Sequence, residues 1–214
     1  MSDDESNWEN LASSPRWRDV VALIRNWVGP LVHSMGMPPD SLDVILRATG
    51  LTLPHAVLEW NLLAGRWDQK GLNDWLPPQD MIMHEGRIVV LGDIAGVTGW
   101  EIRAVDADIE DPPVYSSDVP DDISHPSFSK FVAAMIINDI LFADGNYVEL
   151  KPQAARSALI PLNLSTDESL FADGPLESAT VLVFDYHGDG PVCAKARAPA
   201  GNALLQQLRI EDRV

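Results

Sequence analysis

The first third of the chain has apolar residues at helical spacing. A helix is predicted over residues 15–28, because a Ser-Pro pair starts it and a Gly-Pro pair ends it. Two further helices are predicted over residues 40–50 and 54–65, each closed by a glycine. Residues 1–13 are polar and carry no periodic pattern, so we expect a flexible N-terminus there.

The pattern changes to that of a β-sheet over residues 87–115, where β-branched residues and glycines dominate. Strands are predicted at 88–91 and 100–105, with a glycine-rich bend between them. A third strand starts within 111–115. Its two prolines cannot donate hydrogen bonds to a ladder, so we expect it at a sheet edge.

A long amphipathic helix is predicted to start after Ser124 or Ser127 and to end near Asp144. Beyond it, short strands are predicted at residues 147–150, 159–164, 180–186 and 191–198, followed by a short helix at 203–208. The last two strands are joined by a four-residue hairpin connection. This order of elements predicts an α+β fold, with a single domain over residues 14–214.

The chain is strongly acidic, with 32 acidic against 15 basic side chains and a net charge of -17. This charge repels nucleic acid and anionic lipid, so neither is expected as a partner. The acidic residues gather between Glu101 and Asp122. A solvated loop is the commoner meaning of such a run, and a docking face for a basic protein is the functional one. The docking hypothesis selects as contact residues Asp106, Asp108, Glu110, Asp111, Tyr115, Asp118, Asp121 and Asp122.

Several classes of protein are disfavoured by what the sequence lacks. No apolar stretch has the length of a membrane span, and the first residues are acidic where a signal peptide is basic, so we expect a cytoplasmic protein. The single cysteine, Cys193, permits no internal disulfide. No glycine-rich phosphate loop or dinucleotide fingerprint is present, and no cofactor is expected.

Two clusters of residues allow more than one interpretation. Asp185, His187 and Asp189 alternate at a strand end and could chelate a metal or pair a base with a carboxylate, but a hairpin turn selects the same residue types and is favoured. Trp60, Trp67 and Trp75 could line a pocket or fill a core, and core is favoured. We therefore predict no catalytic, cofactor-binding or metal-binding residue, and no enzyme.

Spaced motifs between residues 40 and 144 carry a resemblance to a known family. They are Leu53-Pro54, a helix with Glu59-Trp60 and Ala64-Gly65, the strand Gly99-Trp100-Glu101-Ile102-Arg103, the segment Asp111-Pro112-Pro113-Val114-Tyr115, and the helix from Phe128 to Phe142. This order resembles the SUKH superfamily, which includes the yeast cell-wall assembly regulator and many bacterial proteins. The signature positions are Pro54, Trp60, Gly65, Gly96, Trp100, Pro112, Pro113, Phe128 and Phe131. Asp93-Ile94-Ala95-Gly96 stands where many members carry Glu-Asn-Gln-Gly, so only the glycine of that motif is retained.

The resemblance implies an α+β domain that works by binding and has no enzymatic activity. Most bacterial relatives look like immunity proteins that neutralise a toxin, often a nuclease, and a basic nuclease would suit an acidic inhibitor. An immunity or antitoxin-type protein is thus the first hypothesis. The alternatives are a regulatory scaffold for an endogenous protein and, third, a hydrolase or metal enzyme using Asp185, His187 and Asp189.

Overall fold

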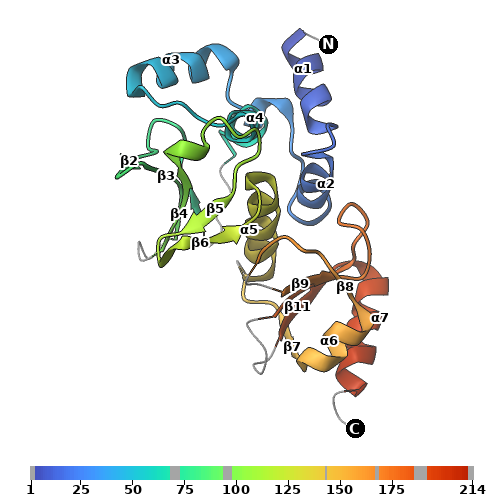
Figure 1. Ribbon diagram of the computed structural model, residues 1–214. Helices are drawn as coiled ribbons and strands as arrows, with labels where there is room; N and C mark the ends of the chain where they lie inside the picture. The colour runs from blue at the N-terminus through green and yellow to red at the C-terminus, as the bar shows by residue number, and fades with distance from the viewer. Residues whose placement is uncertain are drawn as a thin grey trace.

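The computed structural model describes residues 3–67, 73–93, 98–142, 144–166, 169–185 and 192–211. The helices are α1 (Asp3–Ala12), α2 (Arg18–Trp27), α3 (Pro39–Thr49), α4 (His55–Ala64), α5 (Phe128–Phe142), α6 (Pro152–Ala158) and α7 (Ala198–Glu211), with 3-10 turns η1 (His33–Met35) and η2 (Ala104–Asp106). The strands are β1 (Asn73–Trp75), β2 (Met83–His84), β3 (Arg87–Asp93), β4 (Gly99–Arg103), β5 (Val114–Ser116), β6 (Val119–His125), β7 (Val148–Leu150), β8 (Ile160–Pro161), β9 (Ser169–Ala172), β10 (Val181–Asp185) and β11 (Val192–Ala196). They form two antiparallel sheets, which confirms the predicted α+β class (Figure 1).

The N-terminal segment is a helix packed on the core, which differs from the flexible N-terminus expected over residues 1–13. Trp8 on α1 is only 4% exposed, and its Nε1 donates to the carbonyl oxygen of Leu63 on α4 at 3.2 Å. Trp8 packs on the core together with the buried Ala12 and the partly buried Leu11. These positions have helical spacing, but three apolar residues in a short segment that is otherwise polar are too few to predict a helix.

The first sheet has the strand order β1-β3-β4-β5-β6, with β2 also paired to β3. Its β5 therefore lies between two strands, and the predicted edge position is wrong. The strand β6 returns along β5 through a segment that the sequence analysis treated as an acidic loop. Pro112 and Pro113 precede the start of β5 at Val114, so they are not required to donate to the ladder.

The second sheet, ordered β7-β11-β10-β9-β8, separates two apolar cores. Leu182 and Phe184 of β10 belong to the main core with α5, whereas Val181 and Val183 belong to a smaller core with residues of α6 and α7. Because both faces are covered, all of β10 is buried. The predicted antiparallel pairing of β10 with β11 is confirmed, while the hairpin connection at 187–190 lies outside the described residues.

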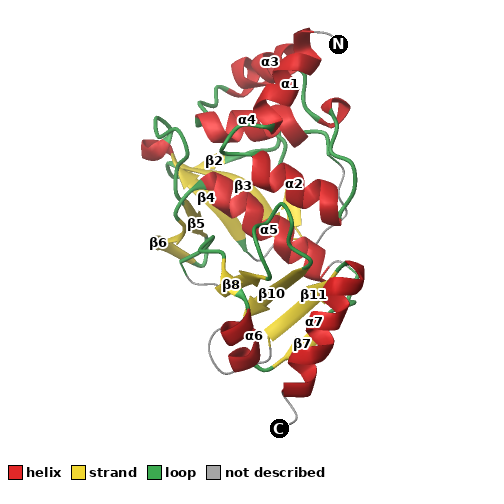
Figure 2. Ribbon diagram, turned by 90° about the vertical axis from the view of Figure 1, so that its right-hand side faces the viewer, coloured by secondary structure: helices red, strands yellow, loops and turns green. Residues whose placement is uncertain are grey.

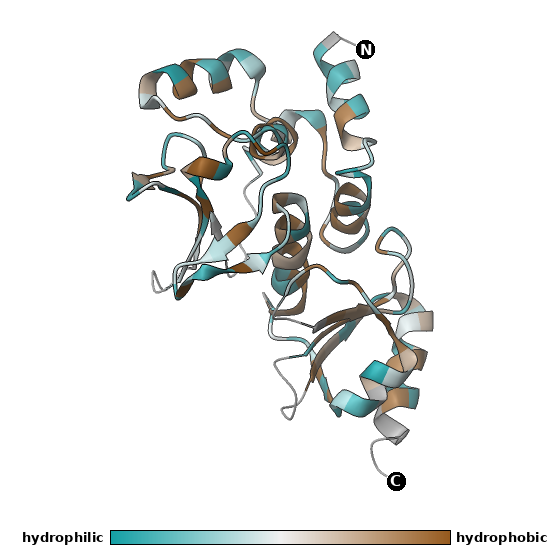
Figure 3. Ribbon diagram, in the orientation of Figure 1, coloured by the Kyte–Doolittle hydropathy of each residue, from teal (hydrophilic) through white to brown (hydrophobic). Residues whose placement is uncertain are grey.

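The long helix α5 lies between the two sheets and the N-terminal helices (Figure 2). It touches α2 and α4 as well as β6, β10 and β11. Burial extends nearly all round it, further than a one-sided amphipathic helix requires, and the ribbon view by hydropathy shows apolar residues along α4, α5 and the second sheet (Figure 3). Within the described part of the chain, no helix has both the length and the apolar character to cross a bilayer.

Truncating Phe131 tests the role of α5. Its ring is fully buried and packs against Trp75, Trp100 and Phe128, so Phe131→Ala is expected to lower the free energy of unfolding by about 3 to 5 kcal/mol. Urea denaturation measures this. Val105→Ala, at a side chain 85% exposed, is the control and should change it by less than about 0.5 kcal/mol.

Candidate functional site

The acidic segment is divided into two groups by the fold. One group, Asp106 to Asp111, follows η2 and runs past the start of α4, where the amide of Ala56 donates to the carbonyl oxygen of Glu110 at 2.9 Å. The other group lies on the hairpin of β5 and β6 and contains Asp118, Asp121 and Asp122. The sequence placed all of these residues on one candidate surface, but their partners differ between the groups.

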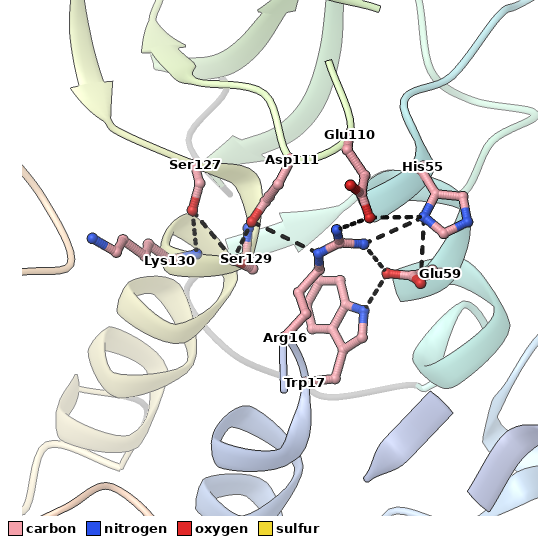
Figure 4. A network of polar contacts seen from close by, with 9 residues as sticks. All are labelled: Arg16, Trp17, His55, Glu59, Glu110, Asp111, Ser127, Ser129 and Lys130. Carbon is pink, nitrogen blue, oxygen red and sulfur yellow. Dashed lines mark hydrogen bonds and ion pairs between the residues drawn. The ribbon is translucent and has the colours of Figure 1, made fainter. Parts of the chain in front are cut away.

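Arg16, at the junction before α2, gathers acidic residues from two distant segments (Figure 4). Its Nη2 donates to Oε1 of Glu110 at 2.6 Å, its Nη1 pairs with Glu59 on α4, and its Nε lies 3.9 Å from Oδ2 of Asp111. Burial alone would lower the pKa of Arg16, but the hydrogen bonds to Glu110 and Glu59 outweigh burial and raise it. The same guanidinium holds the pKa of Glu110 below its usual value.

Glu59 and His55 complete this network on α4. Oε2 of Glu59 also accepts a hydrogen bond from Nε1 of Trp17 at 2.8 Å, which ties α4 to the residue before α2. Nδ1 of His55 lies 3.4 Å from Oε1 of Glu59 and 3.3 Å from Nη1 of Arg16. The network joins charged groups from three parts of the chain: the residues before α2, the helix α4 and the loop before β5. Its role is to stabilise the contact between these parts.

Asp111 acts on the start of α5. Its Oδ1 accepts a hydrogen bond from the amide of Ser129 at 2.9 Å, and its Oδ2 accepts one from the Ser129 hydroxyl at 2.6 Å. A carboxylate at this end of a helix satisfies an amide that has no partner within the helix and complements the helix dipole. Ser127, one of the two predicted cap residues, accepts from the amide of Lys130 at 3.4 Å. Asp111 therefore serves the fold.

Tyr115 and Asp106 are also engaged within the protein. Tyr115 is only 5% exposed, its ring lies 4.1 Å beneath the guanidinium of Arg103, and its hydroxyl donates to Asp106 at 3.4 Å. Burial, followed by the nearby charge of Asp106, raises the pKa of Tyr115. The predicted exposed edge near Tyr115 is wrong, because β6 covers that side of β5.

The hairpin residues are the more exposed part of the acidic segment. Asp118 accepts a hydrogen bond from Thr98 at 2.9 Å. The side chain of Asp121 is 93% exposed and lies 3.5 Å from Arg103 at the closest atoms. Asp108 and Asp122 are exposed as well, and among the described residues neither has a hydrogen bond or an ion pair.

A bulge fixes the backbone that carries these carboxylates. Ser116 pairs with Val119 and Tyr115 pairs with Ile123, so three residues of β6 have no counterpart on β5. Both Arg87 and Arg103 donate to the carbonyl oxygen of Pro120 within this bulge, at 2.9 and 3.0 Å. The two arginines therefore hold the segment that presents Asp121 and Asp122.

The resemblance positions mostly lie in the core. Pro54, Trp60, Pro112, Phe128 and Phe131 are buried, whereas Gly65, Trp100 and Pro113 are partly exposed. Gly96 lies outside the described residues.

The alternating triplet near the end of β10 is described only in part. Asp185 is buried, and its Oδ2 accepts hydrogen bonds from Nε and Nη2 of Arg156 at 2.9 and 2.6 Å. His187 and Asp189 lie outside the described residues. In the described part of the chain, no three His, Cys, Asp or Glu residues group in a way that could hold a metal ion.

The tryptophan cluster (Trp60, Trp67 and Trp75) both contributes to the hydrophobic core and lines a pocket. Trp60 is buried, and its ring centroid lies 5.5 Å from that of Trp75 and 6.4 Å from that of Trp67. The same three rings border a pocket of about 230 Å³, which Arg66 also lines. The tryptophan spacing allowed a pocket as an alternative, but no pattern in the sequence pointed to Arg66, which directly precedes Trp67.

No model of a known protein family, no curated protein and no solved structure matches this chain.

Removing the Asp111 carboxylate is expected to weaken the start of α5. Asp111→Ala should lower the free energy of unfolding by about 1 to 2 kcal/mol, in the range of lost helix caps. Chemical denaturation of the variant measures this. Asp108→Ala removes an acidic residue from the same loop without losing a contact, so an equal loss in both variants would contradict the role of Asp111.

A buried histidine should make the fold sensitive to acid. Burial lowers the pKa of His125 to about 4 from its usual 6.5. Between these values the unfolded chain binds a proton that the folded chain does not, so stability falls as the pH falls from 6.5 to 4, by up to about 3 kcal/mol. The free energy of unfolding at pH 7 and pH 5 measures the effect.

Substitution of the histidines separates this effect from other titrating groups. His125→Gln should reduce the loss of stability between pH 7 and pH 5. His84→Gln, at a side chain that is 79% exposed, should leave it unchanged. If both variants keep the full pH dependence, His125 is not its source.

Proposed function

We propose that this chain is a non-enzymatic binding protein of SUKH type, an immunity protein that neutralises a basic toxin such as a nuclease. The contact surface is the acidic hairpin, defined here as β5 and β6 with the turn between them. The observation that carries the proposal is the exposure of carboxylates and apolar side chains together at this end of the first sheet. Asp121 and Asp122 are exposed beside Val119 and Ile123, which are 52% and 43% exposed.

This combination suits a protein partner. Removing exposed apolar side chains from water makes the free energy of binding more favourable. The flanking carboxylates favour a partner with a basic surface. The strand β6 is the last strand of its sheet, and its far end is covered by Thr166, whose amide donates to the carbonyl oxygen of Ser124 at 2.9 Å. The part of the strand that carries Asp121 and Asp122 lies before this covered end.

Preorganisation of the hairpin supports the same surface. Arg87 and Arg103 hold the Pro120 carbonyl, so the bulge needs little ordering when a partner binds. The two arginines lie largely under the bulge, with side chains 24% and 30% exposed against 93% for Asp121. The outer surface of the hairpin is therefore acidic, in keeping with the net charge of -17.

The proposal retains only part of the contact set predicted from the sequence. Glu110 and Asp111 are bound to Arg16 and Ser129, and Tyr115 is buried, so these three stabilise the fold. On the hairpin, the side chain of Asp122 has no hydrogen bond or ion pair to a described residue, and Asp121 has only ion pairs at its highly exposed carboxylate. A basic partner would associate with them at a rate that falls as salt is added.

Capture from a lysate of the cells that make this protein tests the function. The immobilised chain is washed at low and then high salt, and the eluted proteins are identified. We expect one basic protein, released by salt. An acidic or uncharged protein retained at high salt would contradict the proposal and favour a regulatory scaffold.

Charge reversal on the hairpin tests the surface with the captured partner. Asp121→Lys with Asp122→Lys should raise the dissociation constant at least about tenfold and reduce its salt dependence. Asp43→Lys with Asp80→Lys makes the same change in net charge at exposed acidic residues elsewhere and is the matched control. Equal weakening by both double variants would show that net charge, and not the hairpin, determines binding.

A further inference from the structure

The pocket beside α4 is lined by aromatic rings. Its walls come from the end of α4 and the residues after it, from β1 and the following turn, from β3 and from the start of α5. Trp60, Trp67, Trp75 and Phe128 contribute rings, and Asn61 and Arg66 contribute polar groups. We call this the tryptophan pocket. Its volume of about 230 Å³ exceeds the roughly 150 Å³ of a cavity that takes up benzene, so it has room for a compound with one or two rings.

The rings are arranged around the space in different planes. Trp67 meets Trp60 at 81°, and Trp75 meets it at 52°. Rings set at such angles present both faces and edges to the pocket. A planar aromatic ligand can stack on one ring while its edge meets the face of another, which are the two favoured geometries of aromatic pairs.

Trp75, one of the lining residues, also has a buried indole N–H group. Its Nε1 is buried and has no hydrogen-bond partner among the described residues. A buried N–H group without an acceptor costs free energy, and most buried polar groups in proteins are paired. Because this atom is closed to solvent, the donor is not assigned to a ligand.

Arg66 brings an unused positive charge. Among the arginines whose side chains the structure describes, every other side chain forms a hydrogen bond or an ion pair, while the guanidinium of Arg66 forms neither. This is notable in a chain with about twice as many acidic as basic residues. Its side chain is exposed, so it lies at the mouth of the pocket. A guanidinium in this position favours an anion, above all a carboxylate, and disfavours a cation.

From the ring-lined pocket and the guanidinium at its mouth we infer that the tryptophan pocket binds a small aromatic carboxylate. The ligand's ring lies among the tryptophan rings, and its carboxylate accepts hydrogen bonds from the guanidinium of Arg66 at the mouth. A neutral aromatic compound would leave the guanidinium without a partner. An aromatic amine would place a second positive charge beside it. The site is separate from the acidic hairpin and does not depend on the proposed immunity function.

Titration with three probes of equal ring size tests the inference. Indole-3-acetate, indole and tryptamine share one ring system and carry a negative charge, no charge and a positive charge. Binding is followed by NMR on the indole N–H resonances of the full-length ¹⁵N-labelled chain, with the Trp75 resonance assigned from Trp75→Phe. We expect indole-3-acetate to shift this resonance saturably and to bind at least about tenfold more tightly than indole, with tryptamine weakest.

Matched variants separate the pocket from general effects. Arg66→Gln should raise the dissociation constant of indole-3-acetate about tenfold and leave that of indole unchanged. Arg47→Gln, at an exposed arginine on α3, should change neither dissociation constant. Trp27→Phe removes another buried indole N–H without a partner, one outside the pocket, and should not affect the titration. The inference is overturned if indole-3-acetate leaves the Trp75 resonance unmoved, if the three probes bind equally, or if Arg66→Gln has no effect.

Discussion

The burial of α5 is the constraint on which the rest of the structure depends. Most of this helix is apolar on every side, so it cannot lie on a surface with one face in water. The chain meets this requirement by placing the N-terminal helices, the first sheet and the second sheet around it. Aromatic rings continue the packing outward: Phe128 meets Trp17, and Phe131 meets Trp75 and Trp100. Both sheets therefore contribute residues to the hydrophobic core around α5.

Three arginines of this acidic chain lie at junctions between elements. Arg16 joins the start of α2 to α4 and to the loop before β5, Arg103 supports the hairpin, and Arg156 pairs with the buried Asp185. Each would leave a carboxylate or carbonyl group without its partner if it were removed. The acidic character of the protein is thus expressed unevenly. The carboxylates of Glu59, Asp111 and Asp185 stabilise the fold, whereas exposed ones such as Asp121 and Asp122 give the surface its charge.

This unequal distribution separates the two surfaces that we propose to be functional. The acidic hairpin presents negative charge above two supporting arginines, and the tryptophan pocket presents the guanidinium of Arg66, which is paired with no side chain that the structure describes. Their expected ligands are opposite in charge and very different in size. One surface is suited to a basic protein, and the other to a small anion with an aromatic ring. The two proposals rest on different residues, so either can fail without affecting the other.

The sequence by itself determined the elements whose patterns are local. The helical spacing of α2 to α4, the β-branched runs of β3 and β10, and the apolar length of α5 were sufficient to predict an α+β fold. Helices and strands of this kind repeat at fixed periods, and turns select particular residues, so short windows reveal them. The concentration of acid before residue 122 and the tryptophan cluster were also visible in the sequence, as was the cap at Ser127.

Only the tertiary structure decided which of these residues are free to act. Asp108 and Asp111 stand three positions apart in one acidic run, yet one is exposed and the other caps α5 through Ser129. Arg16 reaches Glu110 across 94 positions, and Trp8 reaches Leu63 across 55, distances over which no local pattern operates. Charge and hydrophobicity belong to each residue and can be read from the sequence. Pairing and burial belong to sets of residues that meet only when the chain has folded.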